Sequence, residues 1–239
     1  MLVDGINVVR ELLNADAWID KIIAEKGNNK DIEKLTDIAR SKGVKVEFVE
    51  KKDLERIAKG KTQGIIAFIP NYKYCKIGDI LGIAESRGEK PFIVILDGIA
   101  DPHNLGAIIR TCECAGVHGV IIPENRACEV TDTVYRTSAG AITHMKIAMV
   151  KNLTRTINEL KQLGVWIYAL EAGNKSIYSA DFTYPTALVI GSEGKGVSRL
   201  VSENVDEILS LDMFGTVNSL NASNAAAIGV YEVVRQRRK

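Results

Sequence analysis

Three short segments of the sequence combine glycine, amide, hydroxyl and charged side chains in patterns that suggest chemistry. They are NLGAIIR at 104–110, GSEGKG at 191–196 and SLNAS at 219–223. Each follows a run of apolar residues that is typical of a buried strand. In a parallel sheet, ligands bind beyond the carboxyl ends of the strands. We therefore expect the three segments to form one site at such an edge.

The first segment places Arg110 about two turns after Asn104, which stands where a helix N-cap is expected. Small side chains at helical spacing around Arg110 leave room for a bulky partner. A guanidinium offers a rigid fork of donors, so one interpretation is that Arg110 binds a phosphate. The alternative is that Asn104 only caps the helix and Arg110 pairs with Glu113.

The second segment has glycines at 191, 194 and 196, which allow tight turns and a close approach of the backbone to a ligand. The spacing matches neither a P-loop nor a dinucleotide-binding fingerprint. Glu193 would repel a phosphate, and it could instead accept a hydrogen bond from a hydroxyl or face a cation. The alternative is a plain turn with a solvated glutamate.

The third segment crowds polar side chains, Asn218, Ser219 and Asn221, at the start of a helix that is rich in alanine. One cap satisfies a helix N-terminus, so the additional polar groups indicate a polar ligand. The alanines predict close packing of this helix against its neighbours. An over-capped core helix is the alternative interpretation.

The amino-acid composition limits the classes of protein to which this chain can belong. The chain has 239 residues, of which 46% are hydrophobic and 26% charged, with a formal net charge of +1, so any basic surface must be local. It contains no apolar stretch of membrane-spanning length and no signal-peptide pattern at its start. Its four cysteines have the spacing of neither a zinc site nor a disulfide framework. We expect a cytoplasmic protein without a bound metal or a membrane segment.

The pattern of apolar runs predicts two domains. Helix-like and strand-like stretches alternate over residues 1–70, which indicates a small α/β domain, and residues 71–88 read as a linker and a first helix. Over residues 89–239, short β-branched runs alternate with helices. This pattern predicts an α/β fold with a buried, mostly parallel sheet.

The three segments, in this order, resemble the signature motifs of the SpoU (TrmH-like) branch of the SPOUT RNA methyltransferases. Residues 1–70 resemble the ribosomal-protein-like substrate-binding domain of family members that methylate a guanosine ribose of 23S ribosomal RNA. The resemblance implies a C-terminal trefoil knot and a homodimer built largely through the knotted region.

The implied reaction is methyl transfer from S-adenosylmethionine to a ribose 2′-hydroxyl of RNA. By resemblance Arg110 is the catalytic arginine, and Asn104, Glu193 and Asn221 orient the nucleophile and hold the loop geometry. The resemblance also implies a set of residues that contact or enclose the cofactor, partly through backbone groups: Gly191, Leu211, Leu220, Leu170, Ile190, Met213, Ser219 and Ser223.

The sequence indicates the RNA target less clearly than it indicates the reaction. The N-terminal stretches GINVV and KTQG depart from the family's His-Pro-like pair and His-Gln-Gly. Arg110, His103 and Lys61 are candidate RNA contacts, although the basic run that ends at Lys61 equally fits an ordinary solvated helix face. A tRNA ribose methyltransferase, an antibiotic-resistance rRNA methyltransferase and a non-catalytic RNA-binding assembly factor are alternatives. The glycine spacing excludes a nicotinamide-dependent Rossmann enzyme.

Overall fold

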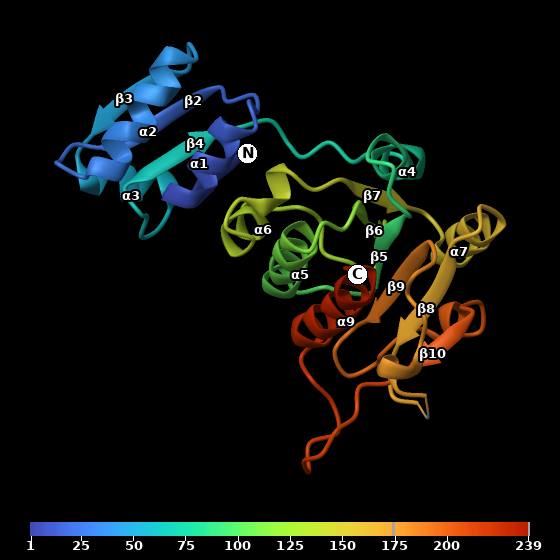
Figure 1. The fold of residues 1–239 in the computed structure, drawn as a ribbon. Helices are drawn as coiled ribbons and strands as arrows, with labels where there is room; N and C mark the ends of the chain where they lie inside the picture. Colours follow the sequence, from blue (N-terminus) through green and yellow to red (C-terminus); the bar gives the residue numbers. More distant parts are fainter. Residues whose placement is uncertain (174, 239) are drawn as a thin grey trace. The chain divides into compact units, whose positions relative to one another are not determined.

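The computed structural model describes residues 1–173 and 175–238, which form two compact units. The first unit comprises Met1–Lys73 together with Val130–His144, and the second comprises Tyr74–Glu129 and the chain from Met145 onward. Each unit has a sheet of its own (Figure 1).

The first unit is built on a mixed four-stranded sheet of order β1-β4-β2-β3. Its strands are β1 (Leu2–Asp4), β2 (Lys21–Glu25), β3 (Lys45–Val49) and β4 (Ile65–Phe68). Its helices are α1 (Ile6–Asn14), α2 (Lys30–Ser41), α3 (Lys51–Ala58), α6 (Asp132–Thr137) and the short 3-10 helix η1 (Ala141–Thr143). The apolar spacing predicted the three longer helices and strands β2 to β4, whereas the three-residue β1 is too short to give a signal.

The two longest helices of this unit begin in different ways. The side chain of Asn29 caps α2 by accepting a hydrogen bond from Asp31 N at 3.0 Å. At α1 the cap position is Gly5, which has no side chain, and Gln63 Oε1 accepts a hydrogen bond from Ile6 N at 3.0 Å instead. The KTQG stretch therefore has a structural role, because its glutamine satisfies a helix N-terminus 57 residues away.

The second unit contains a six-stranded sheet of order β10-β8-β9-β5-β6-β7, in which every described strand pair is parallel. Its strands are β5 (Phe92–Asp97), β6 (Gly119–Pro123), β7 (Ile147–Val150), β8 (Trp166–Leu170), β9 (Thr186–Gly191) and β10 (Glu207–Leu209). The helical elements are α4 (Ile77–Ser86), α5 (Pro102–Cys114), α7 (Leu153–Gln162), η2 (Ile177–Ser179), α8 (Arg199–Ser202) and α9 (Ala222–Arg237). The parallel α/β fold predicted from the sequence is confirmed.

Helices cover both faces of this sheet, which explains why its central strands are apolar along their length. Side chains of α4, α7 and α8 pack with Ile93, Ile95 and Val189 in one core cluster. On the other face α5 and α9 lie side by side (Figure 1). All but the last residue of β5 and of β9 are buried as a result.

The last helix lies close to the sheet because small residues form its inner face. Ala222, Ala226 and Gly229 are buried, and a Cβ added at Gly229 would come within 3.2 Å of Leu170 Cδ2. The alanine-rich sequence thus packs closely, as its composition predicts. None of the helices in the described ranges has both the length and the apolarity that a membrane crossing requires.

The C-terminal end of α9 is fastened by Arg237. Its guanidinium donates hydrogen bonds to four main-chain carbonyls, those of Lys90 (2.8 Å), Pro91 (3.1 Å), Phe182 (3.0 Å) and Tyr184 (2.6 Å). It also lies 5.2 Å from the ring centroid of Phe92. These contacts attach α9 to the segments that lead into β5 and β9.

We expect Arg237→Ala to lower the free energy of unfolding by about 3 kcal/mol, because it removes four hydrogen bonds and leaves the carbonyls of Lys90 and Phe182 without another donor among the described residues. The matched control is Arg238→Ala. Arg238 is exposed, its side chain has no partner within the described residues, and its loss should change stability by less than about 0.5 kcal/mol. Urea denaturation measures both, and equal losses would contradict the role of Arg237.

Candidate active site

Three loops at the carboxyl edge of the six-stranded sheet are joined by hydrogen bonds between side chains. Asn104 Nδ2 donates to Glu193 Oε1 at 3.0 Å, and Asn221 Nδ2 donates to Asn104 Oδ1 at 3.1 Å. Asn221 Nδ2 also donates to Glu193 Oε1. We call these three residues the amide–carboxylate triangle. It brings together one residue from each of the three segments that the sequence singles out.

Asn104 does not cap its helix, so that prediction is wrong. The N-cap of α5 is Asp101, whose Oδ1 accepts a hydrogen bond from His103 N at 2.9 Å. Pro102 follows at the first helical position, where its fixed φ and missing N–H suit a helix start. Asn104 is consequently a buried residue inside the first turn, and its amide is free to bond to the other loops.

The loop after β9 is a tight hairpin. Ser192 N donates to Gly196 O at 3.0 Å, and Gly196 N donates to Ser192 O at 2.9 Å. A Cβ added at Gly191 would lie 2.1 Å from the carbonyl carbon of Gly196, so only glycine fits there. Ser198 N donates to Asp97 Oδ2 at 2.7 Å, which fastens the hairpin to the end of β5. Glu193 therefore stands on a constrained turn, and although it is exposed its carboxylate is held by Asn104 and Asn221.

Asn221 is the N-cap of α9 and serves two purposes at once. Its Oδ1 accepts hydrogen bonds from Ser223 N at 2.9 Å and from Ser223 Oγ at 2.5 Å. Its Nδ2 bonds to the two other members of the triangle. The helix cap thus fixes the direction in which the amide points.

Beside the triangle lies a cavity of about 850 Å³. Most of the predicted cofactor-contacting residues line it, namely Leu170, Ile190, Gly191, Leu211, Met213, Ser219 and Leu220. Glu193 and Asn221 of the triangle line it as well, whereas Ser223, Asn104, Arg110 and His103 are not among its lining residues.

The sequence analysis missed several polar residues in the cavity wall, notably Glu171, Ser210 and Asp212. A signal for Glu171 was present, because it directly follows the apolar strand WIYAL. The rule that ligands lie beyond the carboxyl ends of parallel strands applies to β8 as much as to its neighbours.

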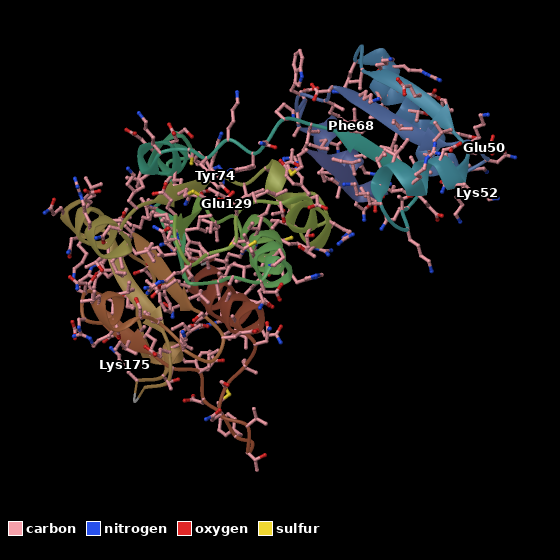
Figure 2. The ribbon with its side chains drawn as sticks, turned by 180° about the vertical axis from the view of Figure 1, so that it is seen from behind. Glu50, Lys52, Phe68, Tyr74, Glu129 and Lys175 are labelled. Carbon is pink, nitrogen blue, oxygen red and sulfur yellow. The ribbon has the colours of Figure 1, made fainter. Side chains whose placement is uncertain are left out.

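Arg110 and His103 lie exposed on α5. Within the described part of the chain, the Arg110 guanidinium has no ion-pair partner, so the alternative in which it pairs with Glu113 is not observed. Lys61 is exposed in the loop before β4 of the first unit. In the basic run beside it, Arg56 pairs with Asp53 at 3.0 Å, and Lys52 projects from the start of α3 (Figure 2).

The four cysteines are free thiols. Burial raises the pKa of the Cys112 thiol far above its usual value, so it is a core residue and not a nucleophile. In the described ranges there is no group of three or more His, Cys, Asp or Glu side chains that could hold a metal ion.

Comparison with known proteins agrees with this geometry. The SpoU rRNA Methylase family matches residues 91–231, and the family described as RNA 2′-O ribose methyltransferase substrate binding matches residues 2–75. A protein of Bacillus subtilis named as the TrmH family tRNA/rRNA methyltransferase YacO is 41% identical over 98% of this chain and 94% of its own length. A TrmH family tRNA/rRNA methyltransferase of Staphylococcus aureus is also 41% identical, over 98% of this chain and 95% of its own.

Among solved structures, the SpoU methyltransferase AviRb from Streptomyces viridochromogenes, crystallised in complex with AdoMet, superimposes with a TM-score of 0.82. It is 24% identical and covers 99% of this chain and 90% of its own. The Aquifex aeolicus TrmH/SpoU tRNA modifying enzyme has a TM-score of 0.57 and 32% identity over 62% of this chain and 76% of its own.

The fold and the site thus define an RNA methyltransferase of the SPOUT class. The chain belongs to the SpoU (TrmH-like) family, with the family's substrate-binding domain at its N-terminal end. A trefoil knot in the last part of the chain is implied by this membership.

We expect Gly191→Ala to lower the free energy of unfolding by about 2 to 3 kcal/mol, because the added methyl group overlaps the backbone of Gly196. Gly194→Ala is the control. Its Cβ would meet nothing within 4 Å, so only its left-handed backbone, with φ of +78°, costs about 1 kcal/mol. Urea denaturation of both variants checks the difference, and a Gly191 variant as stable as the Gly194 variant would refute the close approach.

Proposed function

We propose that this protein transfers a methyl group from S-adenosylmethionine to a ribose 2′-hydroxyl of RNA, with a guanosine of 23S ribosomal RNA as the target. The observation that carries the proposal is the amide–carboxylate triangle beside the cavity. It joins the three family motifs at one edge of the sheet, and these motifs stand where a ligand of a parallel α/β fold binds.

The cavity suits S-adenosylmethionine in size and chemistry. Its volume of about 850 Å³ lies within the range of pockets that hold drug-sized ligands. Leu170, Ile190, Leu211 and Leu220 offer an apolar enclosure for a purine, and the hairpin after β9 brings main-chain groups close to the cavity. When bound, S-adenosylmethionine supplies an electrophilic methyl group.

Arg110 is proposed to act on the RNA. An arginine keeps its proton at any ordinary pH and therefore cannot serve as a general base. It can bind the phosphate next to the target ribose and stabilise the negative charge that develops on the attacking oxygen. A phosphate oxygen or water is then the proton acceptor.

The triangle is proposed to hold the loops in register for the reaction. Because direct displacement at a methyl carbon requires near-contact with the attacking oxygen, positioning contributes much of the rate. Asn104, Glu193 and Asn221 stand on a helix, a tight hairpin and a helix cap, which limits their movement. In this proposal Ser223 supports the site through its bond to Asn221 and does not contact the cofactor directly.

The N-terminal part, residues 1–70, is proposed to bind the RNA, with residues 71–88 as linker and first helix, and residues 89–239 as the methyltransferase domain. The match of residues 2–75 to a substrate-binding family supports this division. Lys61 and His103 are proposed as additional RNA contacts, since both are exposed. The protein is also proposed to act in the cytoplasm.

A homodimer is proposed to form through the C-terminal segment. Residues 212–221, which precede α9, are all exposed, and among them Phe214 is 97% and Val217 71% exposed. Met213 and Leu220 of the same segment are exposed too, and apolar side chains that gather in one exposed patch are typical of an interaction site.

For catalysis, we expect Arg110→Ala to reduce methyl incorporation into RNA by at least about 100-fold, because it removes the charge that stabilises the developing oxyanion. Binding of S-adenosylmethionine, measured by calorimetry, should remain within about twofold. The control is Arg155→Ala, an exposed arginine on α7 that pairs with Glu159. Retained turnover in the Arg110 variant would contradict its role.

For the target, ribose-methylation mapping of total RNA from cells with and without the gene should show one guanosine of 23S ribosomal RNA that loses its methyl group. Loss of a tRNA ribose methylation instead would show that the target is tRNA, and the proposed reaction would still hold. An unchanged map, combined with no heat on titration of S-adenosylmethionine, would favour a non-catalytic RNA-binding protein.

For assembly, we expect Phe214→Glu to weaken the dimer at least about tenfold, because a carboxylate would replace an apolar side chain that the proposed dimer buries. Trp18→Glu is the control, since Trp18 is 75% exposed but belongs to the first unit. Sedimentation velocity over a concentration series reports both. A monomeric parent protein, or equal effects of the two changes, would refute this interface.

A further inference from the structure

Glu171 is a half-buried carboxylate in the cavity wall that has no partner among the described residues. It directly follows β8, where its main-chain N–H donates to Leu209 O at 2.9 Å. Its side chain lies against the hairpin, since a Cβ added at Gly196 would come within 2.5 Å of Glu171 Oε1. Over residues 1–173 and 175–238, this carboxylate accepts no hydrogen bond and forms no ion pair. The cavity wall therefore carries a carboxylate whose charge no described side chain neutralises.

The other charged residues that line the cavity are also mostly acidic. Among the described lining residues the acidic groups are Glu171, Glu193 and Asp212, and the single basic group is Lys195. Glu193 accepts its hydrogen bonds from two neutral amides, and Asp212 accepts one from Ser176 Oγ at 3.0 Å. Neutral donors leave the negative charges in place, so the cavity favours a cation.

Building on the proposed function, we propose that Glu171 selects the positively charged methyl donor over its demethylated product. S-adenosylmethionine carries a sulfonium, an ammonium and a carboxylate group, and its net charge is +1. When the methyl group leaves, the sulfur keeps the electron pair of the broken bond and becomes a neutral thioether. S-adenosylhomocysteine therefore has a net charge of zero. The carboxylate attracts the donor more than the product, which promotes exchange of product for donor after each turnover.

The selection does not depend on direct contact between Glu171 and the sulfur. Coulomb energy falls only as the inverse of distance, and a site partly shielded from water screens it less than bulk solvent does. Because Glu171 lines the cavity, its charge acts on a sulfonium bound there without needing to touch it.

The test is calorimetric titration of the full-length protein and its Glu171→Gln variant with three ligands. These are S-adenosylmethionine, S-adenosylhomocysteine and sinefungin, which has a protonated amine in place of the sulfonium and cannot transfer a methyl group. We expect Glu171→Gln to weaken S-adenosylmethionine and sinefungin about fivefold and S-adenosylhomocysteine less than about twofold.

Two further variants sharpen the result. Glu171→Asp keeps the charge but moves it, so the preference for S-adenosylmethionine over S-adenosylhomocysteine should stay within about twofold of the parent. Glu203→Gln removes a carboxylate that pairs with Arg199 outside the cavity wall, and it should leave all three affinities unchanged. Thermal melting verifies that each variant is folded.

Equal weakening of the binding of all three ligands by Glu171→Gln would overturn the inference. It would mean that Glu171 interacts with a chemical group that donor and product have in common. Unchanged affinities would overturn it too. In both cases binding by the parent protein would leave the proposed function intact. If the parent bound none of the three ligands, the proposed function itself would fail.

Discussion

The site depends on one carboxylate oxygen, Glu193 Oε1, which accepts hydrogen bonds from Asn104 and Asn221. The three side chains come from the loops after β5, β9 and β10, so this oxygen connects three separate strands. Each partner is itself fixed, by a helix turn, a hairpin or a helix cap. Support of this kind keeps a site within the narrow geometry that group transfer requires.

The last helix connects the site to the opposite edge of the sheet. Asn221 caps its N-terminal end at the cavity, and Arg237 near its C-terminal end binds carbonyls of the segments that lead into β5 and β9. The carboxyl ends of the same two strands carry the loops with Asn104 and Glu193. Small residues along the inner face let the helix approach the sheet closely. Position and orientation of α9 are thus fixed at both ends.

Within the second unit, acidic side chains and Arg110 lie in different places. The cavity wall holds Glu171, Glu193 and Asp212 against one lysine among its described residues, whereas Arg110 stands exposed outside that wall. In the proposed function the two reactants carry opposite charges that match these places. The methyl donor is a cation and suits the acidic cavity, whereas the RNA is a polyanion and suits Arg110. Placing opposite charges at the two places separates their binding sites and limits competition between them.

The sequence by itself determined the parallel α/β fold, because apolar runs that alternate with amphipathic helices can be buried only in such a layered sheet. It also identified the three segments of the site, since their residue types are unusual locally. Only the tertiary structure decided that Asp101 and not Asn104 caps α5, that Ile147–Val150 forms a strand, and that residues 130–144 pack with the first unit. The physical reason is the separation along the sequence over which each interaction acts. Propensity and capping act over a few residues, whereas the bonds of the triangle join residues 28, 89 and 117 positions apart, and such pairs meet only after the chain has folded.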